Sequence, residues 1–269
     1  MVPSVAAATS SEPGREPVAA PARVVEITSV TNFRDVAGSG LPLPGGRTMT
    51  TGVVFRSGKL ATLSDADRER LVAAGVTDVI DLRTPAVAKA SPDPVIEGAA
   101  EHSVNIFAVH STASPPKSSA EVARAFMRQR NIDFVANPAQ RARIAEVLTL
   151  IAAAKGPVIV HCTEGKDRTG WVAAVLQLIA GASRDQVIAE YLQSNERRAA
   201  LIKKSYAAAL ARLGPDAAEA RAALLTVERG YLVAGLDRMD TQYGGLAGYL
   251  SQGLGLSEET VTALRERLG

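Results

Sequence analysis

The chain has 269 residues, 46% of them hydrophobic, and a formal net charge of +2 at pH 7. This length allows one large domain or two small ones, the apolar content is ordinary for a protein with a substantial core, and the near-balanced charge gives no reason to expect nucleic-acid binding. The single cysteine excludes an internal disulfide framework and a multi-cysteine zinc site. Three histidines spread along the chain argue against a metal centre, although carboxylate ligands leave one open.

Residues 1–23 are rich in Ala, Pro and Ser and show no apolar period, so we expect a flexible tail. The tail lacks the basic start and long apolar segment of a signal peptide but is compatible with the remnant of one. Secreted and cytoplasmic locations therefore both stay open. No stretch approaches the ~20 unbroken apolar residues of a membrane helix, so no integral membrane segment is expected.

Short β-branched segments bounded by turn residues are predicted to be strands. They cover residues 23–27, 52–56, 76–82, 101–107 and 157–161.

Helical patterns alternate with these strands. Ser64 and Asp67 form a capping box for a helix that Gly75 can end, and a second helix is predicted over residues 138–156. This alternation predicts an α/β fold, in which helices flank a mostly parallel central sheet. After the last strand, residues 169–268 are predicted to be entirely helical, which gives a helical C-terminal half.

Within that half, the segments 169–181, 183–214, 216–244 and a short one starting at residue 257 are predicted to be helices. The first is apolar nearly all round, which indicates a helix buried against the sheet.

Residues 108–121 are polar and contain two prolines, so we expect a loop that leads into a helix at 121–131. A long irregular insertion in a compact domain is often a lid or a binding loop, and 108–131 is therefore a candidate lid. Phe126 and Met127 could cover an aromatic or lipid substrate, although core packing is the commoner use of such residues. Residues 24–269 are expected to form a single domain.

The segment HCTEGKDRTG, residues 161–170, places Cys162 at the carboxyl end of a buried strand and Arg168 at the start of a helix. The positive end of a helix dipole lowers the pKa of a thiol from ~8.5 into a range of ~3.5–7.5. Backbone N–H groups of such a loop bind a phosphate dianion, and an arginine can hold two of its oxygens. Cys162 is therefore predicted to be a nucleophile that forms a phosphocysteine. The phosphate-binding residues are predicted to be Thr163, Glu164, Gly165, Lys166, Asp167 and Arg168.

Three other accounts of the loop are weaker. An inert core thiol would not need the run of polar, charged and glycine residues that follows Cys162. An ATP-binding phosphate loop needs Ser or Thr where Asp167 stands and glycine where Val160 stands. A sulfurtransferase also uses a loop cysteine, but the spacing of Cys162 and Arg168 and the Arg-Thr-Gly ending fit phosphate better.

The pattern His-Cys-x5-Arg-Thr-Gly resembles the cysteine-dependent protein tyrosine phosphatases. Together with NFRDVAG at 32–38, FRSGKL at 55–60, DLRTP at 81–85 and the C-terminal stretch 243–257, it is similar to a narrower bacterial group of these enzymes. The resemblance runs from about Val24 to Gly269. It implies a bacterial protein tyrosine phosphatase that needs no metal or cofactor, and we expect a monomer.

A leaving phenolate or alkoxide needs a proton from a general acid. Many tyrosine phosphatases use a Trp-Pro-Asp loop, which is absent here because the one tryptophan, Trp171, lies in a predicted helix. The resemblance suggests Asp167 instead, although an aspartate directly before a helix also suits an N-cap. The runner-up is Asp81, which ends a predicted strand and could equally pair with a nearby arginine. Asp93 is a distant third.

Other residues are expected to support the loop. Thr169 would hydrogen-bond the thiolate when water cleaves the phosphoenzyme, and His161 would position the loop. Asn32, Arg34 and Asp35 would brace the loop from a neighbouring segment, with a solvated turn as the alternative for each.

The loop charges bear on the substrate. Lys166 beside Arg168 suits a substrate with more than one phosphate, and by resemblance a phosphoinositide, whereas Glu164 would repel a second phosphate. Phosphotyrosine therefore ranks first, and phosphoinositides second. A binding module without turnover is disfavoured because Cys162 and Thr169 are both present with Arg168. Sulfur transfer or oxyanion reduction would call for a persulfide pocket or a second thiol, and the chain has one cysteine.

Overall fold

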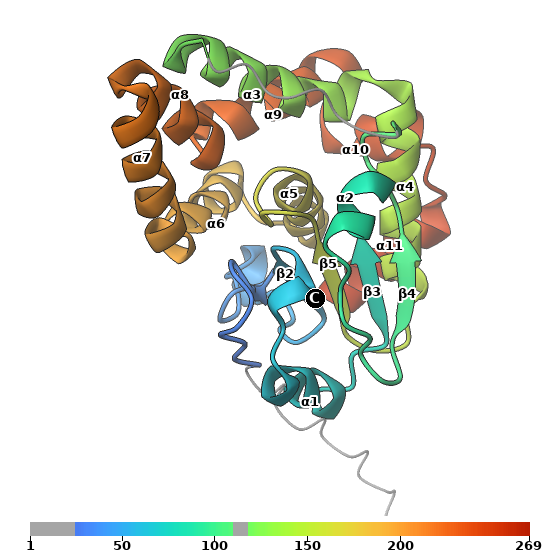
Figure 1. Ribbon diagram of the computed structural model, residues 1–269. Helices are drawn as coiled ribbons and strands as arrows, with labels where there is room; N and C mark the ends of the chain where they lie inside the picture. The colour runs from blue at the N-terminus through green and yellow to red at the C-terminus, as the bar shows by residue number, and fades with distance from the viewer. Residues whose placement is uncertain (1–24, 110–117) are drawn as a thin grey trace, which may run out of the picture.

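A five-stranded sheet lies at the centre of the computed structural model, which describes residues 25–109 and 118–269 (Figure 1). The strand order is β1-β2-β5-β3-β4; β1 pairs antiparallel with β2, and the other pairs are parallel. The strands are β1 (Arg34–Asp35), β2 (Val54–Ser57), β3 (Asp78–Asp81), β4 (Ala100–Ser103) and β5 (Val158–His161). The predicted mostly parallel sheet is confirmed.

The helices carry most of the remaining described chain. They are α1 (Asp65–Ala73), α2 (Pro85–Ala90), α3 (Ala120–Ala136), α4 (Pro138–Ala153), α5 (Arg168–Ala180), α6 (Arg184–Arg197), α7 (Ala199–Leu213), α8 (Pro215–Leu225), α9 (Arg229–Tyr243), α10 (Leu246–Gly248) and α11 (Glu258–Leu268). Short 3₁₀ turns occupy η1 (Pro44–Gly46) and η2 (Leu60–Thr62), and one π-helical turn forms η3 (Tyr249–Gly253). None of the helices in the described ranges is long and apolar enough to span a bilayer.

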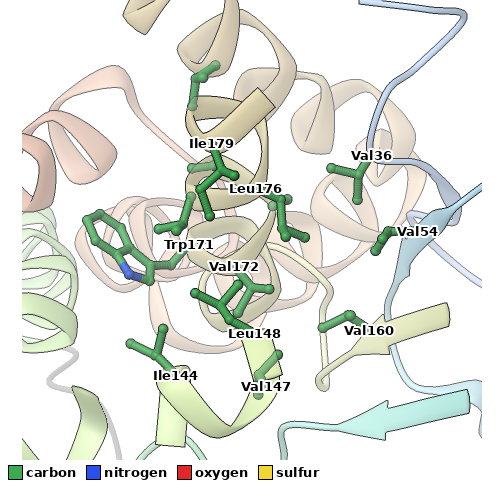
Figure 2. Close-up of a cluster of buried hydrophobic side chains, with 14 of the residues drawn as sticks. Val36, Val54, Ile144, Val147, Leu148, Val160, Trp171, Val172, Leu176 and Ile179 are labelled. Carbon is green, nitrogen blue, oxygen red and sulfur yellow. The ribbon is translucent and has the colours of Figure 1, made fainter. Parts of the chain in front are cut away.

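Side chains alternate between the two faces of the sheet, and each face is covered differently. On β5, Val158 and Val160 join the large core built with α4, α5, α9 and α11, whereas Ile159 joins a smaller cluster with Leu71 of α1. Figure 2 shows the large core, where Val54, Val160 and α5 meet. Helix α5 is buried along most of its length, which confirms the prediction from its all-round apolar sequence.

Strand β5 lies between β2 and β3 in parallel register, so the carboxyl ends of three strands meet at one edge of the sheet. Ser57 and Asp81 are both register partners of His161. Ligands of open α/β sheets bind at such carboxyl ends. The segment after His161 therefore starts where the topology favours a site.

The N-terminal strand predicted over residues 23–27 is wrong for its described part, which is irregular from Val25 on. Ile27 still enters the smaller apolar cluster. The next two N–H groups, of Thr28 and Ser29, donate to the Asp67 carboxylate instead of to a strand. The Asp67 carboxylate therefore accepts hydrogen bonds from residues that are distant in the sequence. Of the predicted capping box only one bond forms, from the Asp67 backbone N–H to the Ser64 hydroxyl.

Two predicted helices are each broken into two. The segment 183–214 bends at Arg198, whose backbone leaves helical geometry, and 216–244 is interrupted between α8 and α9. The expected lid at 108–131 lies partly outside the described residues, because 110–117 are not among them. Helix α3 packs against α8 and α9, and its Met127 is buried there beside Tyr231.

Candidate active site

Cys162 follows β5 directly and is buried, with only 2% of its surface exposed. The loop from Thr163 to Asp167 connects it to the first residue of α5, Arg168. Figure 1 shows α5 starting at the end of β5, so the loop turns between the sheet edge and a helix N-terminus. The predicted strand–loop–helix arrangement around the thiol is confirmed as geometry.

The pKa of the Cys162 thiol lies below its ordinary value. Burial raises this pKa, but the positive charge of Arg168 and hydrogen bonds from the hydroxyl and backbone N–H of Thr169 outweigh burial. The Thr169 side chain is itself fully buried, and no oxygen or nitrogen in the described part of the chain hydrogen-bonds its hydroxyl. This hydroxyl is therefore available to the sulfur.

The Arg168 guanidinium donates hydrogen bonds to two uncharged groups. Its Nη1 donates to the carbonyl of Leu82 at 3.0 Å, and its Nη2 donates to Thr163 Oγ1 at 3.3 Å. A guanidinium has five N–H donors, so donors remain for a phosphate. The Phe107 ring lies 4.6 Å from the Arg168 guanidinium carbon and 4.2 Å from that of Arg130 on α3. A second cation therefore stands beside Arg168.

Gly165 is the loop residue that contacts β2 and the segment before β1. Its backbone is in the left-handed region, with φ at +65°, and a Cβ there would overlap the backbone carbonyl of Ser57. Its carbonyl oxygen accepts 2.8 Å hydrogen bonds from both Asn32 Nδ2 and Arg56 Nη2. Asn32 Nδ2 also donates to the carbonyl of Glu164 at 3.2 Å.

Glu190 of α6 organises these braces. Its two carboxylate oxygens accept 2.6 Å hydrogen bonds, one from Arg34 Nε and one from Arg56 Nη1. Arg34 also donates to Asn32 Oδ1 at 2.5 Å, and burial beside Arg56 lowers the pKa of Arg34 to about 9, while Glu190 raises it. The arrangement links α6, β1 and β2 to the loop backbone.

Asp35 lies apart from this network. Its carboxylate accepts hydrogen bonds from the backbone N–H groups of Ala37 and Gly52, at 2.8 and 2.5 Å. Burial raises the pKa of Asp35 to about 6, although the two hydrogen bonds oppose the rise. Within the described residues, its bonds hold the turns around β1 and β2 rather than the loop.

Lys166 and Asp167 pair with each other. Lys166 is buried, and its Nζ lies 2.9 Å from Asp167 Oδ1 and 3.3 Å from the carbonyl of Thr226. Burial lowers the pKa of Lys166, with Asp167 opposing the change. Asp167 precedes α5, but its side chain makes no capping hydrogen bond to the helix. The N-cap explanation of this residue is therefore wrong, and its carboxylate pairs with Lys166 instead.

Glu164, the other loop acid, pairs with Arg198. The Arg198 guanidinium pairs with Glu164 Oε2 through Nη2 and donates to the carbonyl of Leu225 through Nη1. Arg198 is 1% exposed and stands at the bend between α6 and α7.

Asp81, Asp93 and His161, the last of which directly precedes Cys162, line a cavity of about 320 Å³. Their possible metal-ligating atoms lie within 4.8 Å of one another. The Arg83 guanidinium, however, hydrogen-bonds both carboxylates, so a metal ion would have to displace a cation that is already there. His161 Nε2 lies 3.4 Å from Asp93 Oδ2 and makes no hydrogen bond with any described residue.

The same cluster sets the ionisation of its acids. Burial raises the pKa of Asp81, but hydrogen bonds from Arg83 and the charge of His161 outweigh this and leave the pKa lowered. Burial raises the pKa of Asp93 despite its basic neighbours, and burial lowers the pKa of His161. Asp81 is thus held ionised.

Sequence reasoning missed Glu190, Arg56, Arg198, Arg130 and Phe107. Glu190 and Arg56 are 134 residues apart, so no local spacing connects them. Arg56 lies in the FRSGKL motif, and that motif was the one signal in the sequence that could have pointed to it.

The model of the tyrosine phosphatase family matches residues 25–269, nearly the whole chain. The chain belongs to the tyrosine phosphatase family. It is 34% identical over 278 residues to the triple specificity protein phosphatase PtpB of Mycobacterium tuberculosis, and the match covers 90% of this chain and 98% of that protein. A tyrosine-protein phosphatase of Nostoc commune is 29% identical over 226 residues, which cover 80% of this chain and 73% of the relative. The predictions of the family and of a phosphatase are confirmed.

Proposed function

We propose that this phosphatase hydrolyses phosphotyrosine in proteins through a phosphocysteine on Cys162, without a metal ion. The observation that carries the proposal is the lowered pKa of a thiol that shares one loop with Arg168. The Cys162 thiolate attacks phosphorus, an S–P bond forms, and the bond to the phenolic oxygen breaks. Arg168 holds the equatorial oxygens, over which the negative charge of the transition state is spread. The proposal takes residues 24–269 as one catalytic domain, in line with the family match over 25–269.

Asp167 donates the proton to the leaving oxygen in this proposal. It then takes a proton from the water that attacks phosphorus, while the S–P bond breaks and the thiolate leaves. Thr169 stabilises the departing thiolate through the hydrogen bonds that lower its pKa. Asp81 is less suited to the acid role because the Arg83 guanidinium binds both of its carboxylate oxygens, whereas Lys166 binds Asp167 through Oδ1.

Substrates with a second anionic group form the second class in the proposal, and phosphoinositides belong to it. Lys166 supports this class less than its sequence position suggests, because its ammonium is bound to Asp167 and the Thr226 carbonyl. Arg130 supports it, since its guanidinium shares the Phe107 ring with Arg168. The name triple specificity, carried by the mycobacterial relative, also favours more than one substrate class, so phosphoserine and phosphothreonine are included.

The test is phosphate release from a phosphotyrosine peptide, a phosphoserine peptide and short-chain phosphoinositides, with Cys162→Ser beside the wild type. We expect the highest kcat/KM on phosphotyrosine and none for the serine variant. A wild-type protein that binds these esters but releases no phosphate would defeat the proposal.

The acid assignment is tested with aryl phosphates whose leaving groups differ in pKa. Asp167→Asn should lower kcat about 100-fold for poor leaving groups and much less for good ones, since general acid catalysis contributes about 10²–10⁴-fold. Asp81→Asn is the matched comparison and should show no such dependence on the leaving group. The reverse pattern would move the acid role to Asp81.

A further inference from the structure

The phosphate loop carries two acids and two bases in five residues, and three of these four side chains are paired with a side chain of opposite charge. Lys166 pairs with Asp167 at 2.9 Å. Glu164 pairs with Arg198, which comes from outside the loop. Arg168 is held by the Leu82 carbonyl and the Thr163 hydroxyl, both neutral, and keeps its charge for an anion.

Without Arg198, the balance of charge would change. Lys166 and Asp167 cancel each other, so an unpaired Glu164 would offset Arg168 and leave the loop near neutral. The carboxylate of Glu164 is about one-third exposed and can stay ionised in contact with water after losing its partner. It would then repel a phosphate dianion bound in the same loop.

Resting on the proposed function, we propose that Arg198 is a positioning residue for phosphate binding: its guanidinium neutralises Glu164 and holds that carboxylate away from the phosphate. The place of Arg198 supports this role. It is the residue between α6 and α7, its side chain is buried, and its other terminal nitrogen is fixed by the Leu225 carbonyl. The guanidinium is thereby held in place before any ligand binds.

The test measures the affinity of the full chain for inorganic phosphate by calorimetry, together with kcat and KM for a phosphotyrosine peptide. Arg198→Met should weaken phosphate binding on the order of tenfold, from the repulsion of a dianion by a nearby charge at intermediate dielectric. It should raise KM more than it lowers kcat. The double variant Arg198→Met with Glu164→Gln should bind within about threefold of the wild type, because the unpaired charge is gone. Arg197→Met, at an exposed neighbour, is the control for loss of one positive charge.

Two results would overturn the proposal: unchanged affinity in Arg198→Met, or a double variant as weak as the single one, which would mean that Arg198 only supports the fold. If Arg198→Met does not fold, Arg198→Gln takes its place with the same expectations, because an amide can still donate to the Leu225 carbonyl. Phosphate affinity needs no turnover, so the result is separate from the test of hydrolysis. A wild type that binds phosphate and hydrolyses no ester would defeat the proposed function only.

Discussion

Glu190 and Arg56 form a buried ion pair of 2.6 Å between Oε2 and Nη1, and through it a helix of the C-terminal half is connected to the loop between Cys162 and Arg168. Arg56 connects Glu190 to the loop, because its Nη2 donates a hydrogen bond to the carbonyl of Gly165. Glu190 also binds Arg34 at 2.6 Å.

Glu190→Gln should therefore strongly destabilise the fold. It would leave two buried guanidinium groups without a counter-charge, a situation that costs about 3–5 kcal/mol in buried pairs. Urea unfolding at neutral pH measures the loss. Glu196→Gln, at an exposed position of the same helix, should change the unfolding free energy by less than about 0.5 kcal/mol. Equal effects of the two variants would contradict the role of Glu190.

Gly165→Ala should remove most of the activity. The positive φ disfavours any side chain, and the added methyl group would overlap the Ser57 backbone and push the loop away from the strand. A displacement of about 1 Å in a catalytic group can lower turnover about 100-fold.

Gly98→Ala is the matched control, because Gly98 also has a positive φ but nothing lies where its Cβ would be. It should cost about 1–2 kcal/mol of stability and leave kcat unchanged. Full activity in Gly165→Ala would show that the loop does not need this close approach.

Cys162 should react with iodoacetamide at pH values where an ordinary thiol is protonated. Since its pKa is lowered, the thiolate persists to a lower pH, and the midpoint of the rate–pH curve should fall below ~8.5. Cys162 is the only cysteine, so alkylation followed by mass spectrometry reports this thiol alone.

Thr169→Val removes the hydroxyl that hydrogen-bonds the thiolate and should move that midpoint upward. Thr149→Val, on an exposed part of α4, should leave it unchanged. An unchanged midpoint in Thr169→Val would mean that the Thr169 hydroxyl does not lower the pKa of Cys162.

Asp35 should impose its own pH dependence on stability. Burial raises its pKa to about 6 in the folded protein, above the ~3.9 of an unfolded chain, so the folded state binds this proton more tightly. The contribution to stability is fully present below about pH 4 and is lost as the pH rises to about 6.

The destabilisation caused by Asp35→Asn should accordingly be largest at pH 4 and shrink by about 2 kcal/mol by pH 7. Chemical denaturation at both pH values measures the difference. Asp65→Asn, at an exposed position, serves as the control. Destabilisation by Asp35→Asn that is equal at pH 4 and pH 7 would contradict the raised pKa.

The sequence could predict the elements and residues that are contiguous in the chain. Strand β5, the loop after it and α5 form one unbroken stretch, and their patterns predicted the strand–loop–helix arrangement around Cys162. The bend at Arg198 has no proline or glycine to signal it, and the contacts of Arg198 with Glu164 and Leu225 join residues 34 and 27 positions apart, which no local pattern reveals. The strand predicted over residues 23–27 failed for a related reason: an apolar residue can enter a core without joining a ladder.

Trp171 offers a way to watch the site without a label. It is the one tryptophan of the chain and is fully buried. It lies three residues beyond Arg168 on α5, the helix that follows the loop. Its indole N–H donates to the Tyr249 hydroxyl at 3.3 Å, which in turn donates to the Phe134 carbonyl at 3.0 Å. Its fluorescence therefore reports at once on α5, on α3 and on the C-terminal turn. A movement of the loop on ligand binding would change the emission of Trp171. A separation of the C-terminal helices from the sheet would change it as well.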